Sequence, residues 1–434
     1  MDLEIRDEFI KLGQALKLAG IAASGIEAKM LIEDGVVLVN GETETRRGKK
    51  LRDGDTVSVQ GNSFTVRASE YGTFMLIKSL ELSNFRNYES LHLDFSEGTN
   101  IFYGDNAQGK TNILESLYMI STTKSHRGVK DRDLIRFGQE EAHIRTVLIK
   151  NDLDYQVDMH LRKNKTKGIA INGQRIRKAS ELIGLLHIVF FSPEDLSIVK
   201  DGPSERRRFM DMELCQLDAS YLHDLNHYNK IIDQRNKLLK DVWQFPQLAD
   251  TLDVWDDQLV SYGSRIIERR REFIEELARI VGTIHEKLSG GREKLVISYE
   301  PNCSAENFAA GLKDSRNKDI HLKMTSVGPH RDDFSFVGNE IDLRKFGSQG
   351  QQRTCALSLK LSEIELVTRL IGDKPVLMLD DVLSELDSRR QNYLMNTIGG
   401  IQTMITCTGL DEFVNNRFEI DQLYRIEDGQ VVGG

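Results

Sequence analysis

The first 68 residues carry two helical patterns followed by a series of strand patterns. Apolar side chains recur at three- and four-residue spacing over 7–20, and a second segment of this kind spans 24–35. Three runs rich in β-branched residues come next, with turns between them: VVLVNGE, DTVSV and SFTVRA, and the turns Asn40-Gly41 and Asp53-Gly54. The pattern predicts a small α+β unit over 1–68 and a linker over 69–75.

A different pattern begins at Leu76. Apolar and polar residues alternate over 76–82 and again over 91–95, which predicts two paired strands. The runs NIFYG (100–104) and PVLMLDD (375–381) are mainly apolar, and each predicts a short buried strand. The longer run is typical of a strand inside a parallel sheet.

Helical periodicity dominates 201–290, where Pro246 separates the last two segments. The heptads are too few for an extended coiled coil, so we expect a compact helical lobe. The larger part of the chain is therefore divided into a first sheet-forming half over 76–200, the lobe over 201–320 and a second sheet-forming half over 321–434.

Composition and charge limit the class of protein. The chain has 434 residues, 39% of them hydrophobic, so it can bury a large core. The four cysteines are scattered without the spacing of a zinc site. No run of 18 apolar residues occurs and the acidic start lacks a signal-peptide pattern, so we expect a cytoplasmic protein without a membrane partner. The net charge of −9 counts against indiscriminate polyanion binding, but not against a local DNA-binding surface.

The strongest local signal is GDNAQGKT at 104–111, which fits G-x-x-x-x-G-K-[ST] between a predicted strand and an apolar helix. Backbone N–H groups of such a loop surround phosphates, its lysine reaches the β- and γ-phosphates, and its hydroxyl is a Mg²⁺ ligand. We expect ATP and Mg²⁺ as cofactors. The predicted nucleotide-binding residues are Gly104, Asp105, Asn106, Ala107, Gln108, Gly109, Lys110 and Thr111.

Two carboxylates end the predicted strand at 375–381. Asp380 is placed to hold Mg²⁺ through water, and Asp381 is placed to orient the attacking water as general base. The predicted catalytic residues are therefore Asp381 and Lys110, and the predicted metal ligands are Thr111 and Asp380.

A second glycine-rich loop opens the helical segment over 346–367. Ser348, Gly350 and Gln351 lie where free backbone N–H groups at a helix N-terminus form another anion site. The two loops of one chain cannot easily bind the same phosphate group. We therefore expect an ATP-dependent head-to-tail homodimer, in which this loop reaches the nucleotide held by the partner.

Together these motifs resemble the ABC-type ATPase head of SMC proteins and, within that group, the RecF family. The matching segments are NFRNY (84–88), YGDNAQGKTNILESLY (103–118), SHRGVKDRDLI (125–135), FSPEDLSIVKDGPSERRRFMD (191–211), TSVGPHRDDF (325–334), GSQGQQRT (347–354) and LDDVLSELD (379–387). The resemblance implies an α/β fold, a P-loop ATPase head of mixed sheets and flanking helices with an inserted helical lobe. It also adds Arg86 to the nucleotide-binding residues.

The same resemblance implies a role in recombinational DNA repair and replication. It implies a protein that acts at gapped or duplex DNA with RecR and RecO and helps to load the recombinase RecA. ATP would close a dimer over the DNA, and slow hydrolysis would reopen it.

Three features differ from ABC transporter ATPases. Asp381 stands in place of a glutamate, and Thr406-Cys407-Thr408 stands where those enzymes have a switch histidine. No clear Q-loop glutamine is present, and the turn FFSPEDL (190–196) occupies its place. These departures predict weak, DNA-stimulated hydrolysis and disfavour a transporter ATPase.

The first unit resembles a small RNA-binding module of ribosomal proteins, pseudouridine synthases and tyrosyl-tRNA synthetases. The matching run is LKLAGIAASGIEAKMLIEDGVVLVNGETETRRGKKLRDGD, with five cations between positions 46 and 52. Such a cluster suits phosphate contacts, and a solvated loop is the alternative. The predicted RNA-binding residues are Arg46, Arg47, Lys49 and Lys50. A protein that is chiefly an RNA-binding adaptor, with a head that only reports nucleotide state, is the alternative function.

A cationic hairpin is predicted over 161–178, which holds seven cations and no acid around an Asn172-Gly173 turn. The predicted DNA-binding residues are Arg162, Lys163, Lys165, Lys167, Arg175, Arg177 and Lys178. Three arginines at 206–208 open a helix against its dipole, so they need a compensating partner. The sequence leaves three candidates for that partner: a bound phosphate, acidic residues of this chain, and the other subunit.

Overall fold

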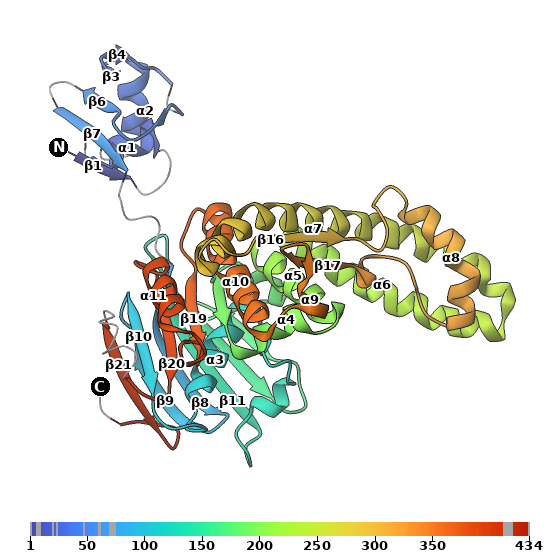
Figure 1. The fold of residues 1–434 in the computed structure, drawn as a ribbon. Helices are drawn as coiled ribbons and strands as arrows, with labels where there is room; N and C mark the ends of the chain where they lie inside the picture. The colour runs from blue at the N-terminus through green and yellow to red at the C-terminus, as the bar shows by residue number, and fades with distance from the viewer. Residues whose placement is uncertain are drawn as a thin grey trace. The chain divides into compact units, whose positions relative to one another are not determined.

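The chain forms two compact units, Met1–Phe74 and Met75–Gly434 (Figure 1). The computed structural model describes residues 2–5, 10–19, 21–22, 25–46, 48–59, 62–68, 75–410 and 420–432. Most of the predicted linker over 69–75 lies outside the described residues.

The first unit contains a five-stranded sheet in the order β1-β7-β6-β3-β4 and a separate pair, β2-β5. Its strands are β1 (Asp2–Ile5), β2 (Ile10–Lys11), β3 (Val37–Val39), β4 (Glu42–Thr43), β5 (Lys50–Leu51), β6 (Thr56–Val59) and β7 (Asn62–Ala68). Two helices, α1 (Leu12–Leu18) and α2 (Gly25–Glu33), share one apolar core with the sheet. Leu16 and Ile32 are completely buried in that core, so each helix is held by its apolar face.

The helix predicted over 7–20 begins later than expected, at Leu12. The prediction is wrong at positions 10 and 11, because these residues pair antiparallel with β5. Strand β1 was not predicted, and it pairs parallel with β7. The helix predicted over 24–35 and the three strand runs are confirmed.

The second unit is built on two six-stranded sheets. The mostly parallel sheet has the order β15-β19-β20-β10-β21-β22, with β10 (Thr99–Tyr103), β15 (Ile188–Phe191), β19 (Val376–Asp380), β20 (Thr403–Cys407), β21 (Gln422–Glu427) and β22 (Gln430–Val431). The antiparallel sheet has the order β14-β13-β12-β11-β8-β9, with β8 (Leu76–Phe85), β9 (Tyr88–Asp94), β11 (Glu141–Lys150), β12 (Leu153–Arg162), β13 (Gly168–Ile171) and β14 (Gln174–Arg175). The strands predicted from Leu76 onward are confirmed, and the predicted parallel strand, β19, pairs with β15 and β20.

Helices cover both faces of the parallel sheet. Helix α3 (Lys110–Thr122) packs in one apolar core with residues of both sheets. Helix α10 (Gln349–Ile371) packs on the opposite face in a second core. Alternation along β19 separates the two cores, because Val376 and Met378 belong to the first and Leu377 belongs to the second. This explains why the predicted run is apolar at successive positions.

The helical lobe contains four longer helices. They are α5 (Pro203–Leu217), α6 (Ala219–Gln244), α7 (Leu252–Ser289) and α8 (Phe308–Leu322). Figure 1 shows α6 and α7 side by side, leading away from the sheets, and α8 packs on both. The helices predicted within 201–290 are confirmed, and Pro246 opens η4 (Pro246–Thr251) between α6 and α7.

Shorter elements complete the second unit. A three-stranded sheet is formed by β16 (Leu295–Glu300), β17 (Asp333–Gly338) and β18 (Ile341–Asp342). The remaining helices are α4 (Leu196–Lys200), α9 (Leu343–Phe346), α11 (Ser388–Thr397), η1 (Asp131–Leu134), η2 (Ala179–Glu181), η3 (Pro193–Asp195), η5 (Pro329–Arg331) and η6 (Leu383–Glu385). Within the described part of the chain, no helix is both long and apolar enough to cross a membrane.

Candidate functional site

The loop over 104–109 joins β10 to α3 and needs glycine at both ends. Gly104 and Gly109 have φ of 147° and 114°, in the region that favours glycine. A Cβ on Gly104 would lie 2.3 Å from the carbonyl oxygen of Ile426, and one on Gly109 would lie 2.5 Å from the Asn87 side chain. Any other residue at either position would therefore displace the loop.

Lys110 is buried at the start of α3. Its Nζ donates hydrogen bonds to the carbonyl oxygens of Gly104 (2.5 Å) and Asp105 (2.7 Å). Burial lowers the pKa of Lys110, and the nearby carboxylates of Asp381 and Asp380 oppose that shift. The loop thus holds its cation beside the acidic strand.

The order of the parallel strands brings Asp380 to the P-loop. Strand β20 lies between β19, which ends at Asp380, and β10, which leads into the loop. Two hydroxyl groups donate to the same carboxylate oxygen Oδ1, that of Thr111 at 2.8 Å and that of Thr406 at 2.7 Å. Burial raises the pKa of Asp380, and these two hydrogen bonds act in the opposite direction.

Asp381 follows in a left-handed backbone conformation with φ 53°. Its backbone N–H donates to Thr406 Oγ1 at 2.9 Å, and the Ser384 hydroxyl donates to its carbonyl oxygen at 2.9 Å. Asp is among the non-glycine residues that tolerate this region best. The turn after β19 therefore directs the second carboxylate differently from the first.

These residues surround one cavity of about 320 Å³. Its lining residues are Asn106, Ala107, Gln108, Gly109, Lys110, Thr111, Asn112, Arg127, Asp380, Asp381 and Thr406. The structure thus gathers the phosphate-loop residues and the acidic pair, although about 270 positions separate them in the sequence. It also adds Arg127 to the lining of this cavity.

Asn87 supports the loop from the turn between β8 and β9. Its Nδ2 donates to the Gln108 carbonyl oxygen at 2.9 Å, and its Oδ1 accepts from Asn112 Nδ2 at 2.8 Å. The Gln108 side chain in turn accepts from the backbone N–H of Asp428 at 2.5 Å. Two distant segments, the β8–β9 turn and the β21–β22 turn, therefore fix the loop.

Arg86 is not among the residues that line the P-loop cavity. Its guanidinium forms a two-bond ion pair with Glu115 of α3, at 2.8 and 2.9 Å, and Glu115 is completely buried. Ser125 also donates to that carboxylate. These contacts of Arg86 therefore tie the β8–β9 turn to the P-loop helix.

The second glycine-rich loop lies at the N-terminus of α10, outside the P-loop cavity. Ser348 caps this helix, and Gln351 completes a capping box with it. The Gln351 side chain donates from Nε2 to Glu293 at 3.1 Å, and Glu293 also contacts the buried His285 at 3.3 Å. Ser348, Gly350 and Gln351 are thus placed together, but not beside the P-loop of the same chain.

The cationic hairpin predicted around Asn172-Gly173 is confirmed as β13 and β14. Five of its seven predicted cations are exposed: Lys163, Lys165, Arg175, Arg177 and Lys178. Lys163 pairs with Glu140 at 2.9 Å, and the half-buried Lys167 pairs with Asp131 at 2.9 Å. Arg162 is also half-buried. The hairpin therefore presents cations, but Lys167 is committed to a neighbouring acid.

The predicted RNA-contact residues lie between β4 and β5 in the first unit. Arg46 forms a two-bond pair with Glu44 at 2.9 and 2.8 Å, and its side chain is exposed. Hydrogen bonds from Arg46 lower the pKa of Glu44 to about 2. Lys49 and Lys50 follow at the edge of β5, whereas Arg47 lies outside the described residues.

The arginines at 206–208 find their partners within the chain. Arg206 is buried and donates to Asp333 at 2.6 and 3.0 Å, so an acid of this chain compensates it. Arg207 donates to the carbonyl oxygen of Asp332 at 2.8 Å, and Arg208 donates to the carbonyl oxygen of His126. Two of the three thus bind the 325–334 motif.

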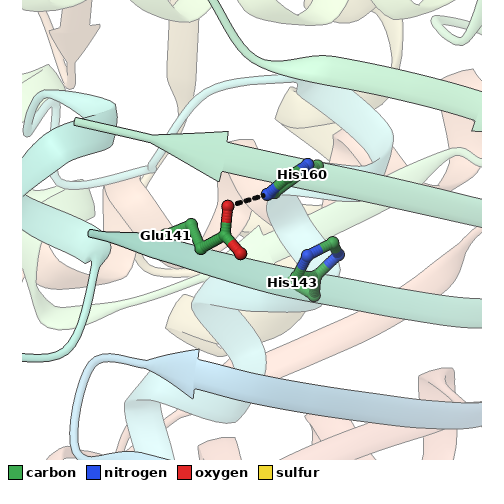
Figure 2. Close-up of side chains that lie close together, drawn as sticks. All are labelled: Glu141, His143 and His160. Carbon is green, nitrogen blue, oxygen red and sulfur yellow. Dashed lines mark hydrogen bonds and ion pairs between the residues drawn. The ribbon is translucent and has the colours of Figure 1, made fainter. Parts of the chain in front are cut away.

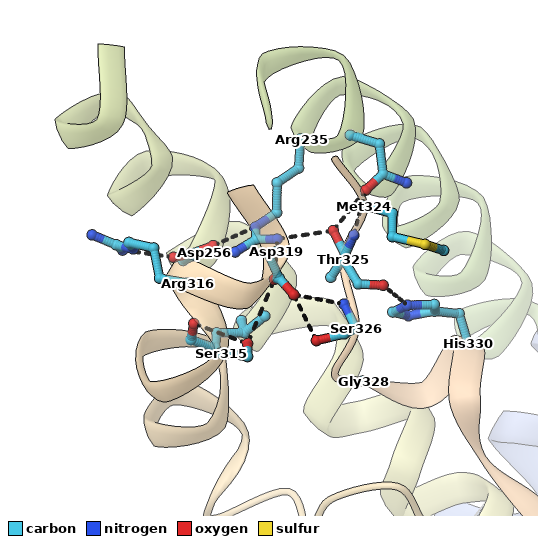
Figure 3. Close-up of polar contacts among 12 residues, drawn as sticks. Arg235, Asp256, Ser315, Arg316, Asp319, Met324, Thr325, Ser326, Gly328 and His330 are labelled. Atoms are coloured by element: carbon cyan, nitrogen blue, oxygen red, sulfur yellow. Dashed lines mark hydrogen bonds and ion pairs between the residues drawn. The ribbon is translucent and has the colours of Figure 1, made fainter. Parts of the chain in front are cut away.

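The same motif is anchored to the helical lobe by a buried polar network (Figure 3). Arg235 of α6 donates to Asp256 at 2.6 Å, to Asp319 at 2.7 Å and to Thr325 at 2.9 Å. His330 contacts the carbonyl oxygen of Thr325 at 3.0 Å. The 325–334 segment is therefore held against the helical lobe.

Sequence reasoning missed three residues of this site. Thr406 was noted only because it stands where transporter ATPases have a histidine. Its bridge between the two aspartates could not be predicted, because the bridge depends on the order of strands in the sheet. Asn87 lies in the NFRNY segment, which was noted for its resemblance and not for loop support. No local sequence pattern marked Glu293 as functional, because its contact with Gln351 joins positions 58 residues apart.

Family models match the chain in two places. The S4 domain model matches residues 3–67, and the RecF/RecN/SMC N terminal domain model matches residues 76–430. The expected fold class, an α/β ATPase head with a small additional module at its N-terminal side, is therefore confirmed.

Curated relatives match over almost their whole length. A DNA replication and repair protein RecF from Agathobacter rectalis is 61% identical, over 82% of this chain and 99% of its own. One from Lachnospira eligens is 60% identical with the same shares. A solved recombination mediator protein RecF with ATP in the RecFOR pathway is 36% identical, with a TM-score of 0.79 over 84% of this chain and 99% of its own. The fold is shared with a solved Smc head domain with a coiled coil and joint derived from Pyrococcus yayanosii. It is 15% identical, with a TM-score of 0.50 over 83% of this chain and 97% of its own.

Proposed function

This chain belongs to the RecF family, and on that premise we propose that it is an ATP-dependent DNA-binding protein of recombinational DNA repair and replication. The observation that carries the proposal is the single cavity that joins Lys110 and Thr111 to Asp380 and Asp381. ATP is the proposed nucleotide, because the RecF relative was solved with ATP and the loop here has the geometry to surround phosphates.

The donor set of the cavity fits Mg²⁺. The Thr111 hydroxyl and the Asp380 carboxylate lie 2.8 Å apart, and magnesium prefers such hard oxygen ligands. We propose these two residues as the metal-holding pair, with Lys110 at the phosphates. Mg²⁺, when bound, neutralises charge on the phosphates.

Slow hydrolysis follows from the residues around the acidic pair. Asp381 is the proposed general base for water, and its shorter side chain reaches less far than a glutamate. Thr406 holds the turn through its hydroxyl, but it cannot take up a proton as a histidine can. Slow turnover suits a switch that stays closed for a long time on DNA.

Dimerisation is the proposed means by which ATP controls DNA binding. Ser348, Gly350 and Gln351 open α10 away from the P-loop cavity of their own chain, so a second copy would have to supply the nucleotide that they contact. DNA would then meet the exposed cations of the β13–β14 hairpin. RecR, RecO and RecA are the partners that membership of the RecF family suggests.

The test measures retention of gapped and duplex DNA with ATP or ADP, together with nucleotide-dependent light scattering. We expect ATP to increase both signals, Lys110→Ala to abolish the increase, and Asp381→Asn to prolong retention by slowing hydrolysis. If neither nucleotide nor Lys110→Ala changes retention, the switch is absent.

A second candidate function rests on the S4 domain match at 3–67. In that case the first unit selects an RNA, and the ATPase head only reports nucleotide state. Deletion of residues 1–74 distinguishes the two proposals. A DNA-repair protein keeps ATP-dependent DNA retention after the deletion, whereas an RNA adaptor loses its principal ligand.

A further inference from the structure

Three metal-ligating side chains gather on one face of the antiparallel sheet, away from the P-loop cavity (Figure 2). Glu141 and His143 lie two positions apart on β11, so they point to the same side. His160 of β12 is directly opposite His143 in the strand register. Two ligands at i and i+2 of one strand, with a third opposite on its neighbour, can converge on a single ion.

The ligand atoms are already close to one another. One oxygen or nitrogen of each side chain lies within 4.8 Å of the other two. His160 Nε2 is 2.9 Å from Glu141 Oε2, and the two imidazole rings stack with centroids 3.9 Å apart. The cluster is therefore assembled by the register of the sheet.

The chemical state of these side chains suits metal binding. Among the described residues, no hydrogen-bond partner is found for the His143 ring nitrogens. A neutral imidazole binds a metal ion through the free lone pair of one ring nitrogen. Two arginines share this face: Arg145 is engaged by Asp158 at 2.6 Å, and Arg162 lies opposite Glu141 in the strand register.

We propose that Glu141, His143 and His160 form a binding site for one divalent transition-metal ion of the zinc class. Two imidazoles and a carboxylate are ligands that zinc accepts, and water completes a four-coordinate shell. The hard ions Mg²⁺ and Ca²⁺ are disfavoured, because two of three ligands are nitrogen.

Binding requires only a local rearrangement. A zinc ion sits about 2.1 Å from each ligand atom, so two ligands of a tetrahedral site lie roughly 3.4 Å apart. The pair Glu141–His160 at 2.9 Å must open slightly, and the stacked rings must tilt because the ion lies in the plane of each ring. All three side chains are exposed or half-buried, so no core packing resists this movement.

The test is calorimetric titration of the tag-free full chain with ZnCl₂ in the absence of nucleotide. We expect one high-affinity ion per chain. Outer-shell partners alone are worth about 10- to 100-fold in metal affinity, so His143→Ala/His160→Ala should weaken binding by at least about 100-fold. Glu141→Gln should weaken it less, because both imidazoles stay in place.

A matched control is provided by a second histidine pair. His223 and His227 of α6 have ring centroids 4.1 Å apart, and they could chelate zinc as helix neighbours. In the proposed case, His223→Ala/His227→Ala leaves the high-affinity event unchanged. Loss of that event in this control variant, or its survival in His143→Ala/His160→Ala, overturns the proposal.

A second readout guards against misfolding of the variants. Circular dichroism should show the same melting curve for all proteins without metal, since the altered side chains lie on the surface. Co²⁺ bound in place of zinc should give visible absorption bands in the wild type and in the α6 control, but not in His143→Ala/His160→Ala. Bands of equal strength in all three proteins would contradict the site.

Discussion

At the scale of single residues, one hydroxyl group organises the acidic end of the nucleotide site. Thr406 donates to the Asp380 carboxylate at 2.7 Å and accepts from the Asp381 backbone at 2.9 Å. Hydrogen bonds to a charged group are worth about 1.5–3 kcal/mol. Thr406 therefore holds the Asp380 carboxylate and the Asp381 backbone in place.

Thr406→Val should slow ATP hydrolysis, because it removes that hydroxyl while keeping the shape of the side chain. We expect a loss of about tenfold in turnover, equivalent to ~1.4 kcal/mol in the barrier. Thr406→Ser should restore most of the rate, since serine keeps the hydroxyl. Steady-state phosphate release checks both variants.

Thr403 offers a control on the same strand. It is buried, and its hydroxyl donates to the carbonyl oxygen of Ile401 at 2.9 Å, not to the acidic pair. Thr403→Val should leave turnover per folded protein unchanged. Equal losses in Thr403→Val and Thr406→Val would mean that the effect comes from β20 as a whole.

Glu293→Ala should weaken nucleotide-dependent dimerisation and leave nucleotide binding by the monomer intact. Glu293 holds the Gln351 amide at 3.1 Å, and the proposed role of Gln351 is to reach the nucleotide of a second subunit. Light scattering with ATP measures the first property, and binding of a fluorescent ATP analogue at low protein concentration measures the second.

The control for this prediction is Glu286→Ala, an exposed acid on the last turn of α7. It should change neither property. If Glu293→Ala weakens monomer nucleotide binding as well, Glu293 does not act through the second loop.

The residue scale also shows what the sequence could predict. Lys110 and Thr111 were found because they belong to a motif of eight consecutive positions. Asp380 was found because a buried strand ending in acid is a local pattern. The bridge through Thr406 joins β20 to the end of β19, and no local pattern carries the order of strands in a sheet.

At the scale of elements, the helical lobe is held together by charge as well as by apolar packing. Arg235 of α6 is completely buried, and it pairs with Asp256 of α7 and Asp319 of α8. Removal of one partner from a buried pair leaves uncompensated charge, which typically costs about 3–5 kcal/mol. The network therefore makes the three helices interdependent.

Arg235→Met should lower the thermal unfolding midpoint strongly, because it leaves two buried carboxylates without this partner. Differential scanning calorimetry of the full chain measures the shift. Arg279→Met on the exposed face of α7 should shift the midpoint little. Similar shifts in the two variants would show that the network adds no particular stability.

Element boundaries differ from expectation where pairing overrides periodicity. The pattern over 7–20 is helical, but positions 10 and 11 form β2 because a partner strand lies beside them. Strand β16 interrupts the predicted helical lobe for the same reason, through its pairing with β17. Long helices such as α7 were predicted well, since each turn repeats the same local signal.

At the scale of the whole molecule, stability of the second unit should depend on pH through buried histidines. Burial lowers the pKa of His126, His187 and His330 to about 4 each. An unfolded histidine titrates near 6.5. Between these values the unfolded chain binds more protons, so these groups reduce stability as pH falls from about 6.5 towards 4.

His330→Gln should therefore flatten the dependence of the unfolding midpoint on pH in that window. Comparison of slopes is necessary, because burial raises the pKa of Asp195 to about 6 and this carboxyl acts in the opposite direction. Thermal melting at pH 7 and pH 5 measures the slope for each protein. Parallel slopes would mean that His330 does not titrate differently in the folded state.

The change of pattern at Leu76 could be recognised in the sequence because two kinds of periodicity meet there. It falls beside the start of the second compact unit at Met75. The metal-ligating cluster of β11 and β12 could not be recognised, since His143 and His160 meet only through the register of a hairpin.

The division into two covalently joined units has a consequence for avidity. Each chain carries one S4-type unit and one ATPase head, so a dimer closed by nucleotide would carry the S4-type unit in two copies. Joined binding modules can hold a ligand with two sites about 100- to 10,000-fold more tightly than one module does. Hydrolysis in the heads would then separate the two copies. An RNA with paired sites would be released, although the affinity of a single S4-type unit would not change.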